Sequence, residues 1–168
     1  SVTSIPSNMC DGCSSIEEVI VQSSILSIGE FAFNECKKLM RISILSSVEE
    51  IERYAFNECS SLKQIIITSN VNKIGEFAFY KCYSLEDVKI SSNELIEINE
   101  STFNNCTSLK QIILPSSVKV INSFAFSNCK SLSHVVIPYS ITSINKYAFS
   151  NCSSLKEVKI PSSLGLIM

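Results

Sequence analysis

The residue best suited to chemistry in this 168-residue chain is cysteine, which occurs eight times. A cysteine can act as a nucleophile, form a disulfide or bind zinc, and its spacing indicates which of these to expect. Seven cysteines follow one another at intervals of 23, 23, 23, 24, 23 and 23 residues: Cys13, Cys36, Cys59, Cys82, Cys106, Cys129 and Cys152. Disulfide frameworks and zinc sites use irregular or clustered spacings, so one cysteine per period indicates a repeated packing position.

Geometry disfavours disulfides between neighbours in this ladder. In-register side chains on adjacent coils of a repeat point the same way, with their Cβ atoms ~4.8 Å apart or more. A disulfide requires Cβ atoms ~3.8 Å apart on converging bonds. We therefore interpret the ladder as buried free thiols, which behave as small apolar side chains.

Cys10 lies outside the ladder and forms the pattern Cys10-Asp11-Gly12-Cys13. This C-x-x-C spacing occurs in redox pairs and in half of many zinc sites. No second C-x-x-C accompanies it, and the only histidine, His134, is far away in the sequence. We favour a packing role for both thiols, and a local disulfide between them is the alternative.

Acid–base chemistry has little support. A single histidine cannot assemble a His-based triad or a multi-histidine metal site. The carboxylates Glu17, Glu18, Glu86 and Asp87 occupy exposed strand positions, and lysines such as Lys63 and Lys110 occur at neighbouring positions. This pattern indicates a solvated charged face. We predict no catalytic, metal or cofactor site, and hence a non-enzymatic protein.

The cysteine ladder is one column of a repeat that runs through the whole chain. The consensus is V-x-x-I-x-x-x-A-F-x-x-C-x-x-L-x-x-I-x-I-P-x-S. The predicted units are 2–24, 25–47, 48–70, 71–94, 95–117, 118–140 and 141–163, with a remnant at 164–168. A unit this small cannot bury its apolar face alone, so stacked units must share one core. The chain is predicted to form a single domain, 1–168, and we expect a piece of a longer array or one whose degenerate end units act as caps.

The units also predict their own elements. The segment L-x-x-I-x-I alternates and is rich in Ile and Val, which indicates a strand, and V-x-x-I indicates a second short extended segment. Stacked copies would form a parallel sheet. The stretch A-F-x-x-C is too short for a full helix, so we predict one helical or 3₁₀ turn there. The prolines Pro115, Pro138 and Pro161 come just after the strand, where a lost backbone donor matters least.

The interior is predicted by column. One column is Phe33, Phe56, Phe79, Phe103, Phe126 and Phe149, six rings in register. A second is Ile16, Leu39, Leu62, Leu85, Leu109, Leu132 and Leu155. Alanine precedes most of the phenylalanines, which indicates limited space beside the rings.

The residues between these columns are the better candidates for function. The middle column of the strand is Ile20, Ser43, Ile66, Lys89, Ile113, Val136 and Lys159. The predicted ligand surface comprises Met40, Arg41, Lys63, Gln64, Ile66, Glu86, Asp87, Lys89, Lys110, Gln111, Ile113, His134, Val136 and Lys156. Exposed Ile and Val with a charged rim are typical of binding surfaces. The alternative is that Ile and Val are present for strand propensity alone.

Composition excludes several partners. The net charge is -2 and the sequence pI about 5.5, which does not indicate nucleic-acid binding. No apolar run approaches the ~20 residues of a membrane helix.

The pattern A-F-x-x-C-x-x-L-x-x-I-x-I-P-x-S-V-x-x-I resembles the BspA-like leucine-rich repeats, also called the Treponema pallidum type, over residues 2–167. Departures are Cys10 in the phenylalanine column, Thr102 in the alanine column and missing prolines in units one to four. The resemblance implies a right-handed solenoid with a parallel sheet on its concave face. It also implies a surface antigen, displayed on the cell or secreted, that binds a protein such as a host extracellular-matrix or cell-surface protein. An intracellular interaction or regulatory scaffold, located in the cytoplasm, is the alternative, and an enzyme is the least favoured.

Overall fold

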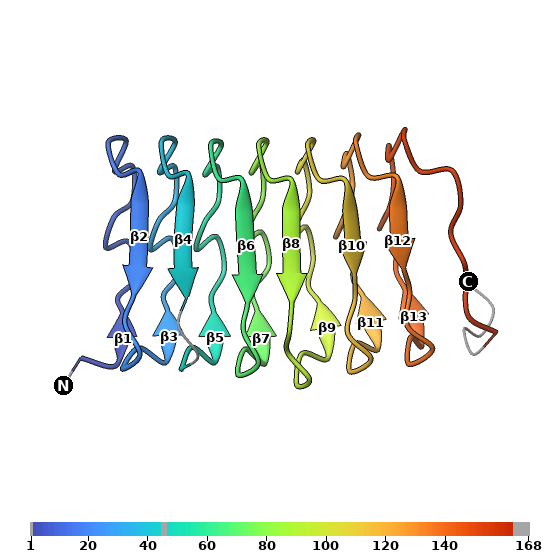
Figure 1. The fold of residues 1–168 in the computed structure, drawn as a ribbon, viewed down its shortest axis with the longest axis horizontal. Coiled ribbons are helices and arrows are strands. Elements are labelled where there is room, and N and C mark those ends of the chain that lie inside the picture. Colours follow the sequence, from blue (N-terminus) through green and yellow to red (C-terminus); the bar gives the residue numbers. More distant parts are fainter. Residues whose placement is uncertain (1, 45–46, 163–168) are drawn as a thin grey trace.

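The chain folds into a row of stacked coils, which in the described residues contribute six long and seven short strands (Figure 1). The computed structural model describes residues 2–44 and 47–162. The long strands are β2 (Glu18–Val21), β4 (Arg41–Ile44), β6 (Gln64–Ile67), β8 (Asp87–Ile90), β10 (Gln111–Ile113) and β12 (His134–Val136). The short strands are β1 (Ser4–Ile5), β3 (Ser27–Ile28), β5 (Glu50–Ile51), β7 (Lys73–Ile74), β9 (Glu97–Ile98), β11 (Val120–Ile121) and β13 (Ser143–Ile144).

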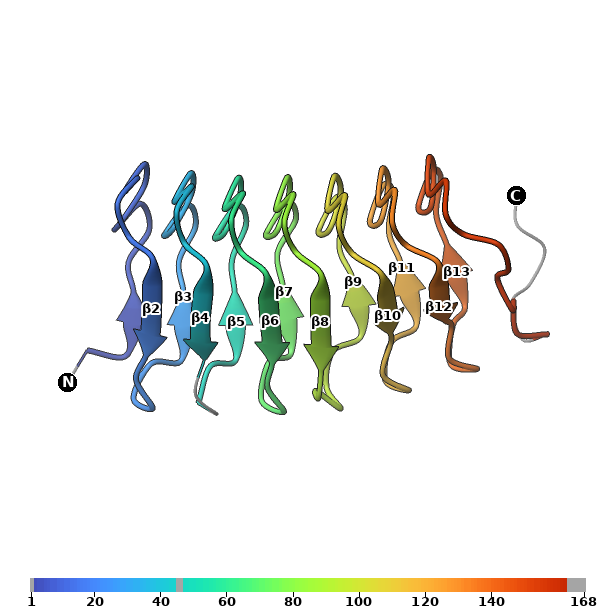
Figure 2. The same cartoon turned by 45° about the horizontal axis from the view of Figure 1, so that its top comes forward.

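The strands pair in parallel with the neighbouring coils, as the repeat predicts. The long strands form a six-stranded sheet in the order β12-β10-β8-β6-β4-β2. Equivalent residues of successive units lie side by side, for example Ile65 and Val88. The short strands form a four-stranded and a three-stranded sheet, which divide between β7 and β9. Figure 2 shows the short strands behind the long ones along the whole row. The prediction of a parallel repeat solenoid is confirmed.

The extra residue of the fourth unit lies in the loop that precedes the division between the two short-strand sheets. Ser92 is fully buried there, and its hydroxyl donates to the Val71 carbonyl oxygen over 2.6 Å. The hydroxyl oxygen of Ser92 in turn accepts the backbone N–H groups of Glu94 and Leu95, each at 3.1 Å. One serine therefore satisfies the polar backbone that the insertion would otherwise leave buried without partners.

The prediction of a helical or 3₁₀ turn at A-F-x-x-C is wrong, because the described residues contain no helix of either kind. Each turn instead holds two residues with φ near +53 to +63°. They lie two residues before and two residues after the column phenylalanine, for example Tyr54 and Glu58 around Phe56. A residue in the left-handed region ends any right-handed helix, so the stretch cannot wind into one.

Hydrogen bonding explains why the turns take this form. Alternate N–H groups point along the row: Phe31 donates to the Arg53 carbonyl, Phe33 to Ala55 and Glu35 to Asn57, over 2.8 to 3.2 Å. The N–H groups between them close i→i−3 turns within the coil, as Ala32 does to Gly29. Half of the donors in each turn are thus satisfied by the next coil, which a helix within the coil would prevent.

The core is a stack of phenylalanine rings running the length of the row. Successive rings from Phe33 to Phe149 lie 5.3 to 5.5 Å apart between centroids and within 8° of parallel. The leucines of the second column are fully buried from Leu39 to Leu132, and Ile16 and Leu155 at the ends are half-buried. The alanines beside the rings are buried, which agrees with the limited space that the sequence indicated.

The last unit departs from the prediction of a seventh strand. Residues 155–160 carry the strand pattern, yet the structure assigns no strand to them and the chain leaves the row there (Figure 1). Within the described residues, the main-chain bonds to the preceding coil reach as far as Ser154, which donates to the Lys130 carbonyl oxygen over 3.1 Å. The remnant at 164–168 lies outside the described residues.

Replacing Phe79 with Ala should lower the free energy of unfolding by ~3–5 kcal/mol, because two flanking rings prevent the void from closing. Phe79 is fully buried between Phe56 and Phe103, each 5.4 Å away. Phe149→Ala is the matched control, since that ring is half-buried and the described residues stack on it from one side only. Urea unfolding measures both. Equal losses for the two variants would contradict a continuous ring stack.

Candidate functional site

The cysteine ladder has a structural role that the sequence did not specify. Each buried thiol donates to a main-chain carbonyl oxygen of the preceding coil. Cys59 donates to Phe33 over 3.1 Å, Cys82 to Phe56 over 3.2 Å and Cys129 to Phe103 over 3.2 Å. The thiol therefore satisfies a carbonyl that the ring stack removes from water.

Burial makes these thiols poor nucleophiles. It raises the pKa of the Cys152 thiol to about 11, and of Cys36, with smaller contributions from nearby Cys13 and Cys10, to about 12. Burial also raises the pKa of Cys59, Cys82, Cys106 and Cys129. A thiol that keeps its proton neither attacks substrates nor binds zinc.

Cys10 and Cys13 are half-buried free thiols at the first coil. Burial raises the pKa of Cys10, and its hydrogen bond with the Cys13 side chain raises it further. No group of three or more His, Cys, Asp or Glu residues within 2–44 and 47–162 could hold a metal ion. The pair is thus close enough for a thiol contact and has no third ligand beside it.

The outer surface of the six-stranded sheet, which we call the sheet face, carries nearly all of the candidate ligand residues. On the described strands and the residue before each, the candidates are exposed except for half-buried Met40 and Asp87. The structure brings together Met40, Arg41, Lys63, Gln64, Ile66, Glu86, Asp87, Lys89, Lys110, Gln111, Ile113, His134 and Val136. Lys156 is exposed but lies beyond β12, in the segment that leaves the row.

Charged residues on the sheet face pair from coil to coil. Arg41 Nε lies 3.3 Å from Glu18 Oε1, and Lys110 Nζ lies 2.6 Å from Glu86 Oε2. The hydrogen bond from Lys110, with the attraction of its charge, lowers the pKa of Glu86. Exposed pairs of this kind contribute ~0–1 kcal/mol to stability. They pair each of these carboxylates with a cation at the exposed surface, which is the solvated charged face expected from the sequence.

Apolar side chains on the sheet face remain exposed. Ile66 is 46% exposed, Ile113 60% and Val136 41%. Ile113 and Val136 are register partners on β10 and β12, so their side chains are neighbours. Two exposed apolar residues are therefore adjacent at the C-terminal end of the sheet, whereas Ile20 on β2, at the other end, is 60% exposed beside the polar Ser43.

A second aromatic ladder runs along the turns and was missed by the sequence analysis. It lies two residues before the core rings, at positions with positive φ. One group of stacked rings is Phe31, Tyr54 and Phe77, with centroids 4.7 and 4.8 Å apart. The other is Phe124 and Tyr147, 5.0 Å apart, and Ser101 occupies the position between the two groups. Aromatic residues recurring at the 23-residue period were the available signal. Since the ring faces contact one another, mostly ring edges face solvent.

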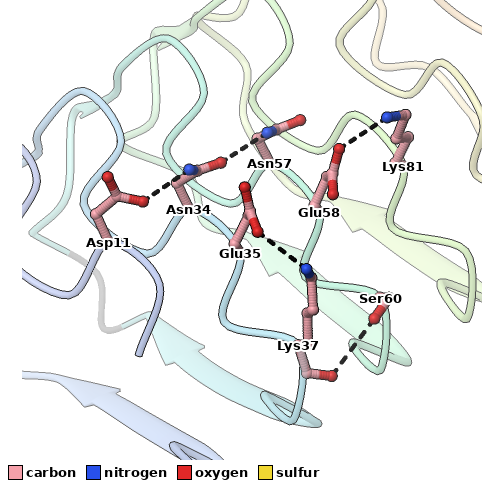
Figure 3. Close-up of polar contacts among 8 residues, drawn as sticks. All are labelled: Asp11, Asn34, Glu35, Lys37, Asn57, Glu58, Ser60 and Lys81. Carbon is pink, nitrogen blue, oxygen red and sulfur yellow. Dashed lines mark hydrogen bonds and ion pairs between the residues drawn. The ribbon is translucent and has the colours of Figure 1, made fainter. Parts of the chain in front are cut away.

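The same turns carry a polar ladder (Figure 3). Asn34 Nδ2 donates to Asp11 Oδ1 over 2.7 Å, and Asn57 Nδ2 donates to Asn34 Oδ1 over 2.6 Å. Lys81 Nζ donates to Glu58 Oε1 over 2.7 Å beside it. Asn57 Oδ1 is buried with no hydrogen-bond partner among the described residues. These amides bond successive coils to one another, which is a structural role.

Comparison with known proteins agrees with this geometry. The family model described as "BspA type Leucine rich repeat region (6 copies)" matches over residues 3–94 and 91–168. The chain belongs to the BspA-type leucine-rich repeat family. No curated protein matches the sequence significantly.

Solved structures of similar proteins share the fold. The T. pallidum leucine-rich repeat protein is 32% identical, with a TM-score of 0.88, over 93% of this chain and 72% of that one. A leucine-rich repeat protein from Bacteroides ovatus is 31% identical, with a TM-score of 0.74, over 98% of this chain and 48% of that one. A leucine-rich repeat protein from Eubacterium ventriosum is 27% identical, with a TM-score of 0.84, over 91% of this chain and 41% of that one. This BspA-type chain spans less than half the length of the latter two.

The raised thiol pKa values predict a specific alkaline instability. The folded protein holds the Cys82 proton more tightly than the unfolded chain does, so this stabilisation is complete below about pH 9 and is lost as pH rises. The stability gap between wild type and Cys82→Ala should narrow by ~1.4 kcal/mol per pH unit above pH 9. Urea unfolding from pH 8 to 11 under reducing conditions measures it. Leu62→Ala, which removes no titrating group, should show a constant gap, and a constant gap for Cys82→Ala would refute the account.

Proposed function

We propose that this BspA-type repeat is a non-enzymatic scaffold that binds a protein ligand through the sheet face. The observation that carries the proposal is the exposure of Ile66, Ile113 and Val136 on a rigid sheet whose core is packed behind it. Apolar residues surrounded by charged ones are typical of interfaces between proteins that associate reversibly. Leucine-rich repeats as a class bind proteins, which supports the same reading.

The rigidity of the array favours binding. A ligand that docks on a preformed sheet does not have to order it, so less free energy is lost on association. Side chains of the sheet face lie outside the core columns, so they can differ between coils without disturbing the stack. Each coil thus offers three outward positions, as at Glu86, Asp87 and Lys89.

The proposal of a non-enzymatic role is supported by the thiols and the histidine. Six ladder cysteines have raised pKa values and donate to main-chain oxygens. His134 is exposed on β12, and no nucleophile is hydrogen-bonded to it among the described residues. A general base must reach the proton that it removes.

We further propose that the protein acts at the cell surface or after secretion, as the family resemblance implies. No helix in the described ranges is long and apolar enough to cross a membrane. A cytoplasmic interaction scaffold is the competing location. Protease shaving of intact producing cells, followed by detection of the chain in supernatant and lysate, discriminates the two. Protection of the whole population until lysis would exclude surface display.

The binding proposal predicts a loss of affinity when the sheet face is altered. Arg41→Glu with Lys89→Glu reverses two exposed charges on β4 and β8. Since buried packing is unchanged, unfolding should shift little while affinity falls about tenfold, the range expected for charge reversal at an interface. Purified fibronectin, laminin and collagen immobilised on a sensor surface are the probes.

The matched control is Lys38→Glu with Lys130→Glu, two exposed lysines at the turns away from the strands. It has the same change in net charge and should bind as wild type. Equal loss in both double variants would indicate non-specific charge effects. Failure of all three probes to bind the wild-type chain would refute the matrix-protein ligand.

A further inference from the structure

A cleft lies between β12 and the segment that leaves the row after Leu155. Its volume is about 760 Å³, within the ~300–1,000 Å³ typical of ligand sites. One wall is β12 with the residues on either side of it, and the other is Lys156 to Ser162. The cleft therefore occupies the space where a seventh strand of the sheet would lie.

The edge of the sheet facing the cleft has unused backbone groups. β12 is the terminal strand of the six-stranded sheet, with β10 as its neighbour. At the start of each long strand, a backbone N–H donates to a backbone carbonyl of the preceding coil. These bonds run from Lys63 to Met40, Glu86 to Lys63, Lys110 to Glu86 and Ser133 to Lys110. The equivalent bond from the Lys156 N–H to the Ser133 carbonyl is absent from the described residues. A free strand edge is a template for pairing with another extended chain.

The walls of the cleft are apolar and carry unpaired positive charge. Val136 is 41% exposed and Ile160 52%. Lys156 and Lys159 line the cleft and form no ion pair within the described part of the chain, and one carboxylate, Glu157, accompanies them. The cleft therefore offers apolar contact beside a surplus of cations.

The charge of this end of the protein reinforces that surplus. Residues 95–168 carry six lysines and three glutamates, a net charge of +3, whereas residues 1–94 carry eight basic and thirteen acidic residues, a net charge of -5. All seven described ion pairs lie between Glu18 and Lys110. The lysines beyond Lys110 thus remain unmatched and attract an acidic partner.

We propose that the cleft binds an extended acidic peptide segment of a protein partner, which adds to the free edge of β12 as a strand. The sheet-side wall of the cleft runs from Ser133 to Ile137, so about five residues of an extended peptide would pair along it. Alternate side chains would contact Val136 and Ile160, and carboxylates would meet Lys156 and Lys159. This deepens the proposed function, because it names the kind of segment that the C-terminal end of the binding surface takes.

The competing occupant is the chain itself. Residues 155–160 carry the strand pattern, with Val158 and Ile160 in the columns of Val135 and Ile137. In the structure Ile160 is exposed whereas Ile137 is buried, so this segment has not taken that position. Closure of residues 156–160 onto β12 would remove the cleft, and the experiment must tell the two apart.

The test uses three fluorescein-labelled ten-residue peptides, titrated with the 168-residue chain by fluorescence anisotropy. One alternates Val with Glu, the second alternates Val with Lys, and the third is the first with Pro at two central positions. The acidic peptide should bind at least about tenfold more tightly than the lysine peptide because of the unmatched lysines. The proline peptide should lose at least about tenfold, since proline cannot donate to a strand.

Variants locate the site. Lys156→Glu with Lys159→Glu should weaken the acidic peptide about tenfold. Lys119→Glu with Lys146→Glu is the matched control, with the same change in net charge on exposed lysines that do not line the cleft, and it should change affinity less than about threefold. Equal weakening in both would overturn the proposal, as would acidic and lysine peptides that bind alike or a proline peptide that binds as well as its parent.

Amide hydrogen exchange distinguishes a bound peptide from closure of residues 156–160 onto β12. In the free protein, amides of residues 157–160 should exchange faster than those of β12, and the acidic peptide should slow exchange at Val135 and Val136. Protection of residues 157–160 equal to that of β12 in the free protein would overturn the proposal, because the chain would then fill its own edge. If the wild-type chain bound the acidic peptide but no matrix protein, the proposed matrix-protein ligand would be refuted and the cleft proposal would stand. If it bound a matrix protein but not the acidic peptide, the cleft proposal alone would be refuted.

Discussion

Each coil of this protein depends on its neighbour for hydrogen bonds that it cannot make itself. In the A-F-x-x-C turns, alternate N–H groups donate to the following coil, and the cysteine thiols donate back to the preceding one. Buried polar backbone without a partner is destabilising by about 1–3 kcal/mol per group. A single coil would leave several such groups unsatisfied, so the row of coils is stable only as a whole. The stacked phenylalanine rings then fill the space that this bonding encloses.

The period and the columns of the repeat allowed the parallel sheets, the ring stack and the outward positions to be predicted. Equivalent residues in a row of coils must share one environment, so one column predicts burial for all its members. Phe33 to Phe126 are buried as one set for this reason, and Ile20, Ile66 and Ile113 are exposed as another. The environment of a column does not depend on the backbone path between the columns.

The backbone path of the turns was the part that could not be predicted. Tyr54 and Phe77 adopt a positive φ, which aromatic residues rarely do, so local propensity pointed to the wrong structure. Stacking with the rings of adjacent coils and the N–H bond to the next coil favour the conformation, and both arise only in the assembled row. The end of the row differs for a related reason. Residues 155–160 have the strand pattern, but they form a strand only if they pair with β12. The pattern alone does not determine whether that pairing forms.

The charge along the row bears on function more than the total of -2 indicates. The described ion pairs all lie between Glu18 and Lys110, and the unpaired Lys156 and Lys159 line the cleft with Val136. Apolar exposure and uncompensated charge therefore coincide at one end of the sheet face. A hydrogen-exchange footprint of the chain bound to a matrix protein tests the central claim most directly. The account predicts slowed exchange in the long strands from β4 to β12 with the turns unchanged. Slowed exchange confined to the turns around Phe31, Tyr54 and Phe77 would contradict it.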